Sequence, residues 1–255
     1  MSFAACAALV HDGDPDRFLA TMTAVPDLRG PLFVLYAFNL ELARAGSVTN
    51  EPMIAQMRLQ FWRDCLDQAA AGGEPRAHEV AGPLMKLLAE NRLKPDFAHQ
   101  MIDAYSRALA PEYPETDEDL DGFLRDTGGA LMALAGGFVA PDLNPDPLID
   151  YGTGAATANL LRALPKLEQQ GKRMLLDGRQ GPIATRAKTA LEQMRSARSK
   201  LNTKALLPVL RTAFLAEPIL KTACKNPEKV ATGTLEPTEF SRRLRMIALV
   251  AAGRY

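Results

Sequence analysis

Apolar residues recur along most of the chain at the three- and four-residue spacing of α-helices, most densely from Pro31 to Asp67. The first half of this stretch, residues 31–45, is apolar on nearly every side, which predicts a helix buried inside a bundle. Pro31 suits the first position of that helix, where its missing N–H is harmless. The apolar positions are Leu32, Phe33, Val34, Leu35, Tyr36, Ala37, Phe38, Leu40, Leu42 and Ala43.

A second helix is predicted to begin near Pro52, with Asn50 or Glu51 as its N-cap. Its apolar residues repeat on one side, which predicts an amphipathic helix. The apolar face is predicted to hold Ile54, Met57, Phe61, Cys65 and Ala69, widened by Trp62 and Leu66. The opposite face holds Gln56, Gln60, Arg63 and Asp67.

The rest of the pattern predicts further helices and almost no strand. The predicted ranges are 15–24, 77–90, 95–109, 116–139, 149–169, 183–201, 206–215, 218–224 and 238–252, with a loop over 226–236. Pro165 is expected to bend or end the helix over 149–169. Because 255 residues can bury a sizeable core, residues 1–255 are predicted to form a single all-α domain, a helical bundle.

The composition is that of a folded globular protein, with 47% hydrophobic and 24% charged residues. No apolar run reaches the ~18 residues of a membrane span. No Lys or Arg precedes Arg17, so the basic start of a signal or transit peptide is missing. Cys6, Cys65 and Cys224 are odd in number and far apart, which favours a reducing compartment. These features predict a bacterial cytoplasmic protein.

The net charge of zero conceals an asymmetry between the two parts of the chain. Residues 1–150 carry 11 Lys and Arg against 23 Asp and Glu, whereas residues 151–255 carry 19 against 7. The two parts could attract each other within one fold, or the basic part could face anionic lipid at a membrane surface or a diphosphate. The basic helices lack interleaved aromatic residues, which argues against a nucleic-acid partner.

Three polar residues, Asn39, Glu41 and Arg44, interrupt the buried helix over 31–45. Buried polar groups need partners. Glu41 and Arg44 are three residues apart and can meet on one face, and Arg58 is a further candidate partner. These residues form either a structural polar network or part of a ligand-binding site.

An acidic cluster begins the predicted helix over 116–139. Asp117 and Asp121 could together ligate Mg²⁺. Thr116 and Asp119 have the spacing of a capping box, which is the favoured interpretation because acids in a first turn also complement the helix dipole. Farther along, small residues either permit close helix packing or leave room for a ligand: Gly128, Gly129, Ala130, Ala133, Ala135, Gly136 and Gly137.

Three segments resemble the squalene/phytoene synthase superfamily: VPDLRGPLFVLYAF (25–38), LYAFNLELA (35–43) and RLQFWRD (58–64). The resemblance is greatest to the branch that contains assembly factors of respiratory complex I. It implies the all-helical isoprenoid synthase bundle, with a central cavity lined by the helix over 116–139.

Two departures from the family pattern bear on activity. The family's second catalytic segment, N-x-x-R-D-x-x-x-D, is matched by Asn159 and Arg162, but Ala163 and Leu167 stand where its aspartates belong. In the first catalytic segment, Ala43, Arg44 and Ser47 stand at the aspartate positions. Family members use such aspartates to hold Mg²⁺ against a prenyl diphosphate. The resemblance therefore implies a protein without catalytic residues, metal ligands or cofactor.

Three functions remain open. The favoured one is a non-catalytic protein acting at or near the membrane, with a respiratory-complex subunit or assembly intermediate as partner. The first alternative is a Mg²⁺-dependent prenyltransferase joining two prenyl diphosphates, and the second is a metal-free isoprenoid or lipid binding protein. The predicted ligand-binding residues are Asn39, Glu41, Arg44, Arg58, Asn159 and Arg162.

Overall fold

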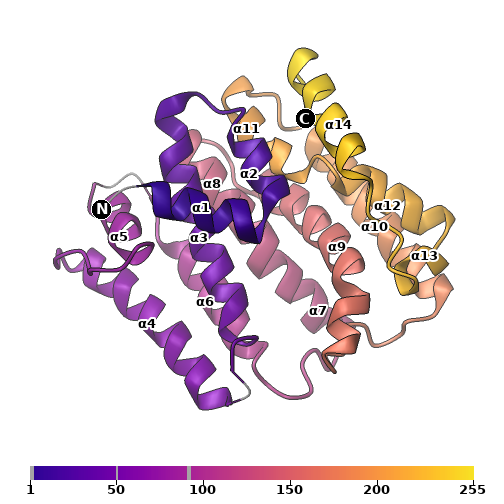
Figure 1. Cartoon of the computed structure of the whole chain (residues 1–255), viewed down its shortest axis with the longest axis horizontal. Coiled ribbons are helices and arrows are strands. Elements are labelled where there is room, and N and C mark those ends of the chain that lie inside the picture. The colour runs from indigo at the N-terminus through magenta and orange to yellow at the C-terminus, as the bar shows by residue number, and fades with distance from the viewer. Residues whose placement is uncertain (1–2, 50, 91–92) are drawn as a thin grey trace.

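The computed structural model describes residues 3–49, 51–90 and 93–255, and every regular element within these ranges is helical (Figure 1). The all-α prediction is confirmed. The first helices are α1 (Phe3–Gly13), α2 (Pro15–Thr21), α3 (Pro26–Ala45), α4 (Pro52–Ala70), α5 (Ala81–Ala89), α6 (Asp96–Arg107) and α7 (Asp117–Leu124). The later ones are α8 (Ala130–Val139), α9 (Asp146–Gln169), α10 (Gln180–Arg198), α11 (Leu207–Leu210), α12 (Ala216–Lys225), α13 (Glu228–Ala231) and α14 (Glu239–Ala251).

The buried helix of the bundle is α3, but it begins earlier than its apolar pattern predicted. Its first residue is Pro26, which follows the extended backbone of Val25, and Pro31 lies inside the helix. A proline near the start of a helix removes one backbone hydrogen bond, and the deep burial that follows outweighs this loss. Residues 31–38 are all buried, as predicted.

The predicted face of α4 is partly wrong. Trp62, Cys65, Leu66 and Ala69 are buried as expected, whereas Met57 is 66% exposed and Ile54 is 41% exposed. Ala55 and Leu59 take their places inside. We attribute the rotation to Trp62, whose ring packs 5.3 Å from that of Phe38 in α3, because the largest side chain dominates such a contact.

Other boundaries of the predicted elements also shift. The helix expected over 77–90 begins only at Ala81, because the His78 side chain accepts the backbone N–H groups of Val80 and Ala81 and caps it. Glu51 is the N-cap of α4 and its side chain makes no capping bond, while Asn50 lies outside the described residues. The predicted loop over 226–236 contains the short helix α13.

The acidic start of α7 is a capping box, as favoured. The Thr116 hydroxyl accepts the Asp119 N–H at 3.1 Å, and the Asp119 carboxylate accepts the Thr116 N–H at 3.0 Å. Asp117 and Asp121 both form ion pairs with Arg186 of α10. The two carboxylates therefore hold a guanidinium and join α7 to α10. The predicted helix over 116–139 is continuous but contains a π-helical turn, Arg125–Gly129, between α7 and α8.

The longest helix, α9, packs against α8, α10, α12 and the π-helical turn. It continues through Pro165 to Gln169, so this proline does not end it. Glycines allow its close approach: a Cβ atom built on Gly152 would lie 2.5 Å from the backbone oxygen of Gly128. No helix within the described ranges is long and apolar enough to cross a bilayer.

Candidate functional site

A cavity of about 1240 Å³ lies between α3, α6, α7, α8 and α9. Three connections contribute to its lining: α3–α4 with Gly46 and Thr49, α6–α7 with residues 108–115, and α9–α10 with residues 171–174. These connections lie along the lower edge of the molecule in Figure 1. A space of this size can enclose a drug-sized or larger apolar ligand.

Several positions that the family resemblance singled out line this cavity. Ala43 of α3 faces it, as do Ala163 and Leu167 of α9. These side chains offer no carboxylate oxygen, the ligand that Mg²⁺ requires. Arg44 instead lies 3.7 Å from the carboxylate of Glu41, so the expected contact between these residues is present. The residues at these positions do not fit a Mg²⁺–diphosphate site. Within the described ranges, no three or more His, Cys, Asp or Glu side chains are placed to hold a metal.

The structure separates the six predicted ligand-binding residues. It brings Asn39 of α3 and Asn159 of α9 to the wall of the same cavity. Glu41 and Arg44 form their pair outside the lining, with side chains 21% and 40% exposed. Arg58 is exposed on α4 and is also outside the lining.

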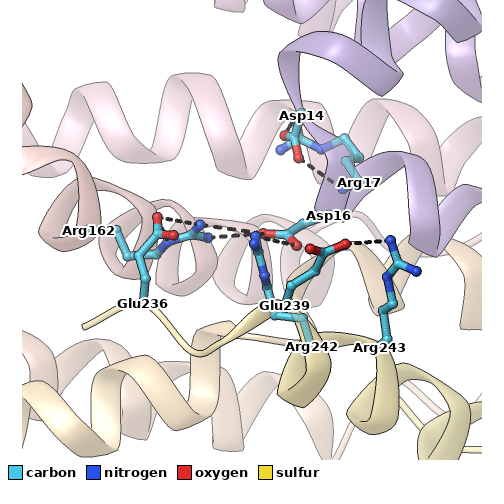
Figure 2. A network of polar contacts seen from close by, with 8 residues as sticks. All are labelled: Asp14, Asp16, Arg17, Arg162, Glu236, Glu239, Arg242 and Arg243. Atoms are coloured by element: carbon cyan, nitrogen blue, oxygen red, sulfur yellow. Dashed lines mark hydrogen bonds and ion pairs between the residues drawn. The ribbon is translucent and has the colours of Figure 1, made fainter. Parts of the chain in front are cut away.

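Arg162 belongs to a polar network that joins α2, α9 and α14 (Figure 2). Its guanidinium lies 2.9 Å from the carboxylate of Glu236 and 3.4 Å from that of Asp16. Arg242 of α14 contacts the same Asp16 at 3.2 Å. Both Arg162 and Asp16 are mostly buried, with side chains 17% and 16% exposed. In this structure Arg162 connects segments far apart in the sequence and does not line the cavity.

Two cavity-lining residues were not singled out by the sequence. Among the buried side chains that the structure describes, Arg17 Nε and Tyr36 Oη have no hydrogen-bond partner. The Arg17 guanidinium lies 5.3 Å from the centre of the Tyr36 ring. Its Nη1 atom forms an ion pair with the Asp14 carboxylate at 2.9 Å. The apolar run around Tyr36 indicated only core, and Arg17 lies within a short helix without a motif. The sequence therefore carried no signal for this pair.

Burial raises the pKa of two phenols in the cavity wall. Desolvation raises the pKa of Tyr36 well above its usual value, although the nearby Arg17 charge opposes this shift. Desolvation likewise raises the pKa of Tyr105, which also lines the cavity, to about 12. A phenol is a neutral hydrogen-bond donor near pH 7, and the raised pKa values extend that state further into the alkaline range. With the guanidinium of Arg17, the two phenols give this part of the wall donor character suited to an anionic or carbonyl oxygen.

The structure is an all-helical bundle with a large cavity between its helices. The chain belongs to the squalene/phytoene synthase family, whose profile matches residues 10–176. The fold is shared with the crystal structure of a squalene synthase from Alicyclobacillus acidocaldarius: the TM-score is 0.70 at 18% identity, covering 89% of this chain and 94% of the other.

Curated relatives carry the name of an assembly factor. A Drosophila melanogaster protein, "NADH dehydrogenase (ubiquinone) complex I, assembly factor 6 homolog", is 28% identical over 235 residues, which cover 88% of this chain and 68% of that protein. The Bos taurus assembly factor 6 is 26% identical over 162 residues, covering 63% of this chain and 48% of the relative. The chain thus matches only about half the length of the bovine protein.

Proposed function

We propose that this chain is a non-catalytic member of the squalene/phytoene synthase family that takes part in the assembly of respiratory complex I, close to a membrane. The observation that carries the proposal is the chemistry of the cavity wall. Ala43, Ala163 and Leu167 stand at positions where the family resemblance places aspartates. Without carboxylates at these positions, the ligands with which the family usually holds Mg²⁺ against a diphosphate leaving group are missing from them. The similarity to proteins named complex I assembly factor 6 supports complex I subunits or assembly intermediates as the partner.

Affinity purification of the tagged chain from a native membrane extract tests this proposal. We expect subunits or assembly intermediates of complex I to be recovered with it, because the proposed role requires contact with them. The matched control is a tagged, active squalene synthase of the same fold, which should not recover them. Deletion of the gene should lower the amount of assembled complex I on native gels. Normal complex I assembly after deletion, or Mg²⁺-dependent release of diphosphate by the purified chain, would refute the proposal.

A metal-free ligand-binding role is a second candidate, because Arg17 Nε and Tyr36 Oη lack partners in the cavity wall. A buried polar atom without a hydrogen bond costs stability, and a ligand that reached it would supply the missing partner. An isoprenoid or lipid with an anionic or carbonyl end group matches both the apolar part of the lining and these donors. This role is compatible with the assembly role, since the ligand could regulate it.

Replacing Arg17 by methionine is expected to weaken ligand binding by about 10- to 100-fold, since a hydrogen bond to a charged group contributes about 1.5–3 kcal/mol. The measurement is calorimetric titration with farnesyl diphosphate in the presence of EDTA. Arg44→Met is the matched control, because Arg44 pairs with Glu41 outside the cavity lining. Absence of binding by the unaltered chain would reject the ligand role. Binding that needs Mg²⁺ and releases diphosphate would favour the prenyltransferase alternative.

A further inference from the structure

The last helix, α14, turns two arginines and a methionine inward and a row of apolar side chains outward. On the inner side, Arg242 contacts Asp16, the Arg245 Nε donates to the Phe214 carbonyl oxygen at 2.7 Å, and Met246 is 3% exposed. Figure 1 shows α14 at the edge of the molecule, beside the C-terminus. The polar contacts fix the rotation of the helix about its axis, so its outer face cannot turn into the core.

The outer face of α14 is an apolar stripe. Phe240 is 75% exposed, Leu244 54%, Ile247 65% and Val250 43%. Their spacings of four, three and three residues place them along one side of a helix. A surface helix of a globular protein normally shows the reverse arrangement, and a contiguous exposed apolar patch marks a site of interaction.

The charges around the stripe indicate its partner. Arg243, with its side chain 70% exposed, lies beside the stripe and pairs with Glu239 of the same helix, and Arg254 is exposed just beyond the end of the helix. Residues 195–255 carry 12 Lys and Arg against 4 Asp and Glu. An apolar helix face flanked by arginines, on a positively charged part of the chain, complements a bilayer that contains anionic lipid.

The shape of α14 favours a bilayer over a protein partner. A helix of 13 residues is about 20 Å long and presents a single convex ridge. A stable protein–protein interface buries about 800 Å² on each partner and needs a complementary surface. A bilayer accepts one apolar ridge without any preformed groove, because lipids rearrange around it.

We propose that α14 lies flat in the interface of an anionic bilayer, with the Phe240–Leu244–Ile247–Val250 stripe in the acyl boundary and the neighbouring arginines at the headgroups. This membrane contact rests on the proposed function in one respect only, which is that the protein acts close to a membrane. It is assigned to one helix that lies outside the residues matched by the family profile.

A tryptophan placed on the stripe reports insertion directly. The chain has one tryptophan, Trp62, which is 3% exposed and gives a constant background. In Phe240→Trp, emission should shift to the blue when vesicles of phosphatidylcholine and phosphatidylglycerol are added. Vesicles of phosphatidylcholine alone should give a smaller shift, and salt should reduce the effect. The matched control is Met57→Trp, because Met57 is 66% exposed on α4 and should stay in water.

Sedimentation with the same vesicles gives the second measurement. The double variant Phe240→Ser and Ile247→Ser should partition at least about tenfold more weakly than the unaltered chain, since each exposed side chain would lose its burial in lipid. Met53→Ser with Met57→Ser should bind normally.

Three results would overturn the proposal. The first is no blue shift of the Phe240→Trp emission with anionic vesicles, and the second is an equal blue shift in Met57→Trp. The third is a blue shift in Phe240→Trp that rises with protein concentration in the absence of lipid, which would assign the stripe to contact with a second copy of the chain. Recovery of complex I subunits in detergent tests the assembly role separately, so failure of vesicle binding leaves that result unaffected.

Discussion

Replacing Gly152 by alanine is expected to lower the free energy of unfolding by about 1–3 kcal/mol, the usual cost of overpacking a close-packed core. A Cβ atom at this position would lie 2.5 Å from the backbone oxygen of Gly128, 2.6 Å from the Cβ of Met132 and 3.0 Å from the Cα of Gly129. None of these atoms is the end of a flexible side chain, so α9 must move away from the π-helical turn. Urea unfolding followed by circular dichroism measures the change.

Gly137→Ala is the matched control for this prediction. Gly137 is also helical, but a Cβ atom there would meet nothing within 4 Å. Alanine has the higher helix propensity, so this variant should be more stable than the unaltered chain by up to about 1 kcal/mol. Equal stability of the two variants would show that α9 does not approach the π-helical turn as closely as described. Because Gly152 also lines the cavity, Gly152→Ala should alter ligand binding as well.

Replacing Asp16 by alanine is expected to lower the free energy of unfolding by roughly 3 kcal/mol, the lower end of the cost of removing one partner from a buried ion pair. The Asp16 carboxylate contacts both Arg162 and Arg242, and its side chain is only 16% exposed (Figure 2). Without it, two largely buried guanidinium groups lose a shared counterion. Because Arg242 fixes α14 to α2, hydrogen exchange in α14 should also become faster, which mass spectrometry can measure.

The exposed pair Glu239–Arg243 provides the control within the same region. Its side chains are 67% and 70% exposed, so water and salt screen the interaction. Glu239→Gln should therefore change stability by less than about 1 kcal/mol. If Asp16→Ala costs no more than Glu239→Gln, the network around Arg162 does not hold α14 in place.

Local patterns predicted much of the fold. Three correctly predicted features depend on residues within about two helical turns of one another. They are the buried segment of α3, the amphipathic character of α4 and the capping box of α7. Hydrophobic periodicity and side-chain capping act over that range, so a single sequence is enough to detect them. The central segments also predict membership in the squalene/phytoene synthase family, and the profile match over residues 10–176 confirms this membership.

The errors came where packing overrides local pattern. Ile54 and Met57 of α4 fit an apolar face by spacing, yet they are exposed in the packed helix, which buries Ala55 and Leu59 instead. The pattern predicts Pro31 at the start of the buried helix, whereas α3 begins at Pro26. In both cases, more than one local solution satisfied the periodicity, and a neighbouring helix or residue selected among them.

The sequence by itself determined the all-helical architecture, the buried α3 and the membership in the squalene/phytoene synthase family, because these depend on short-range periodicity and motifs. Only the tertiary structure decided which polar groups face the cavity. It brought Asn39 and Asn159 to one wall, left a buried polar atom of Arg17 and of Tyr36 without a hydrogen-bond partner, and paired Arg162 with Asp16, which is 146 residues away in the chain. Such contacts depend on how whole helices pack, since helical periodicity specifies the face of a side chain but not the partner that the face will meet.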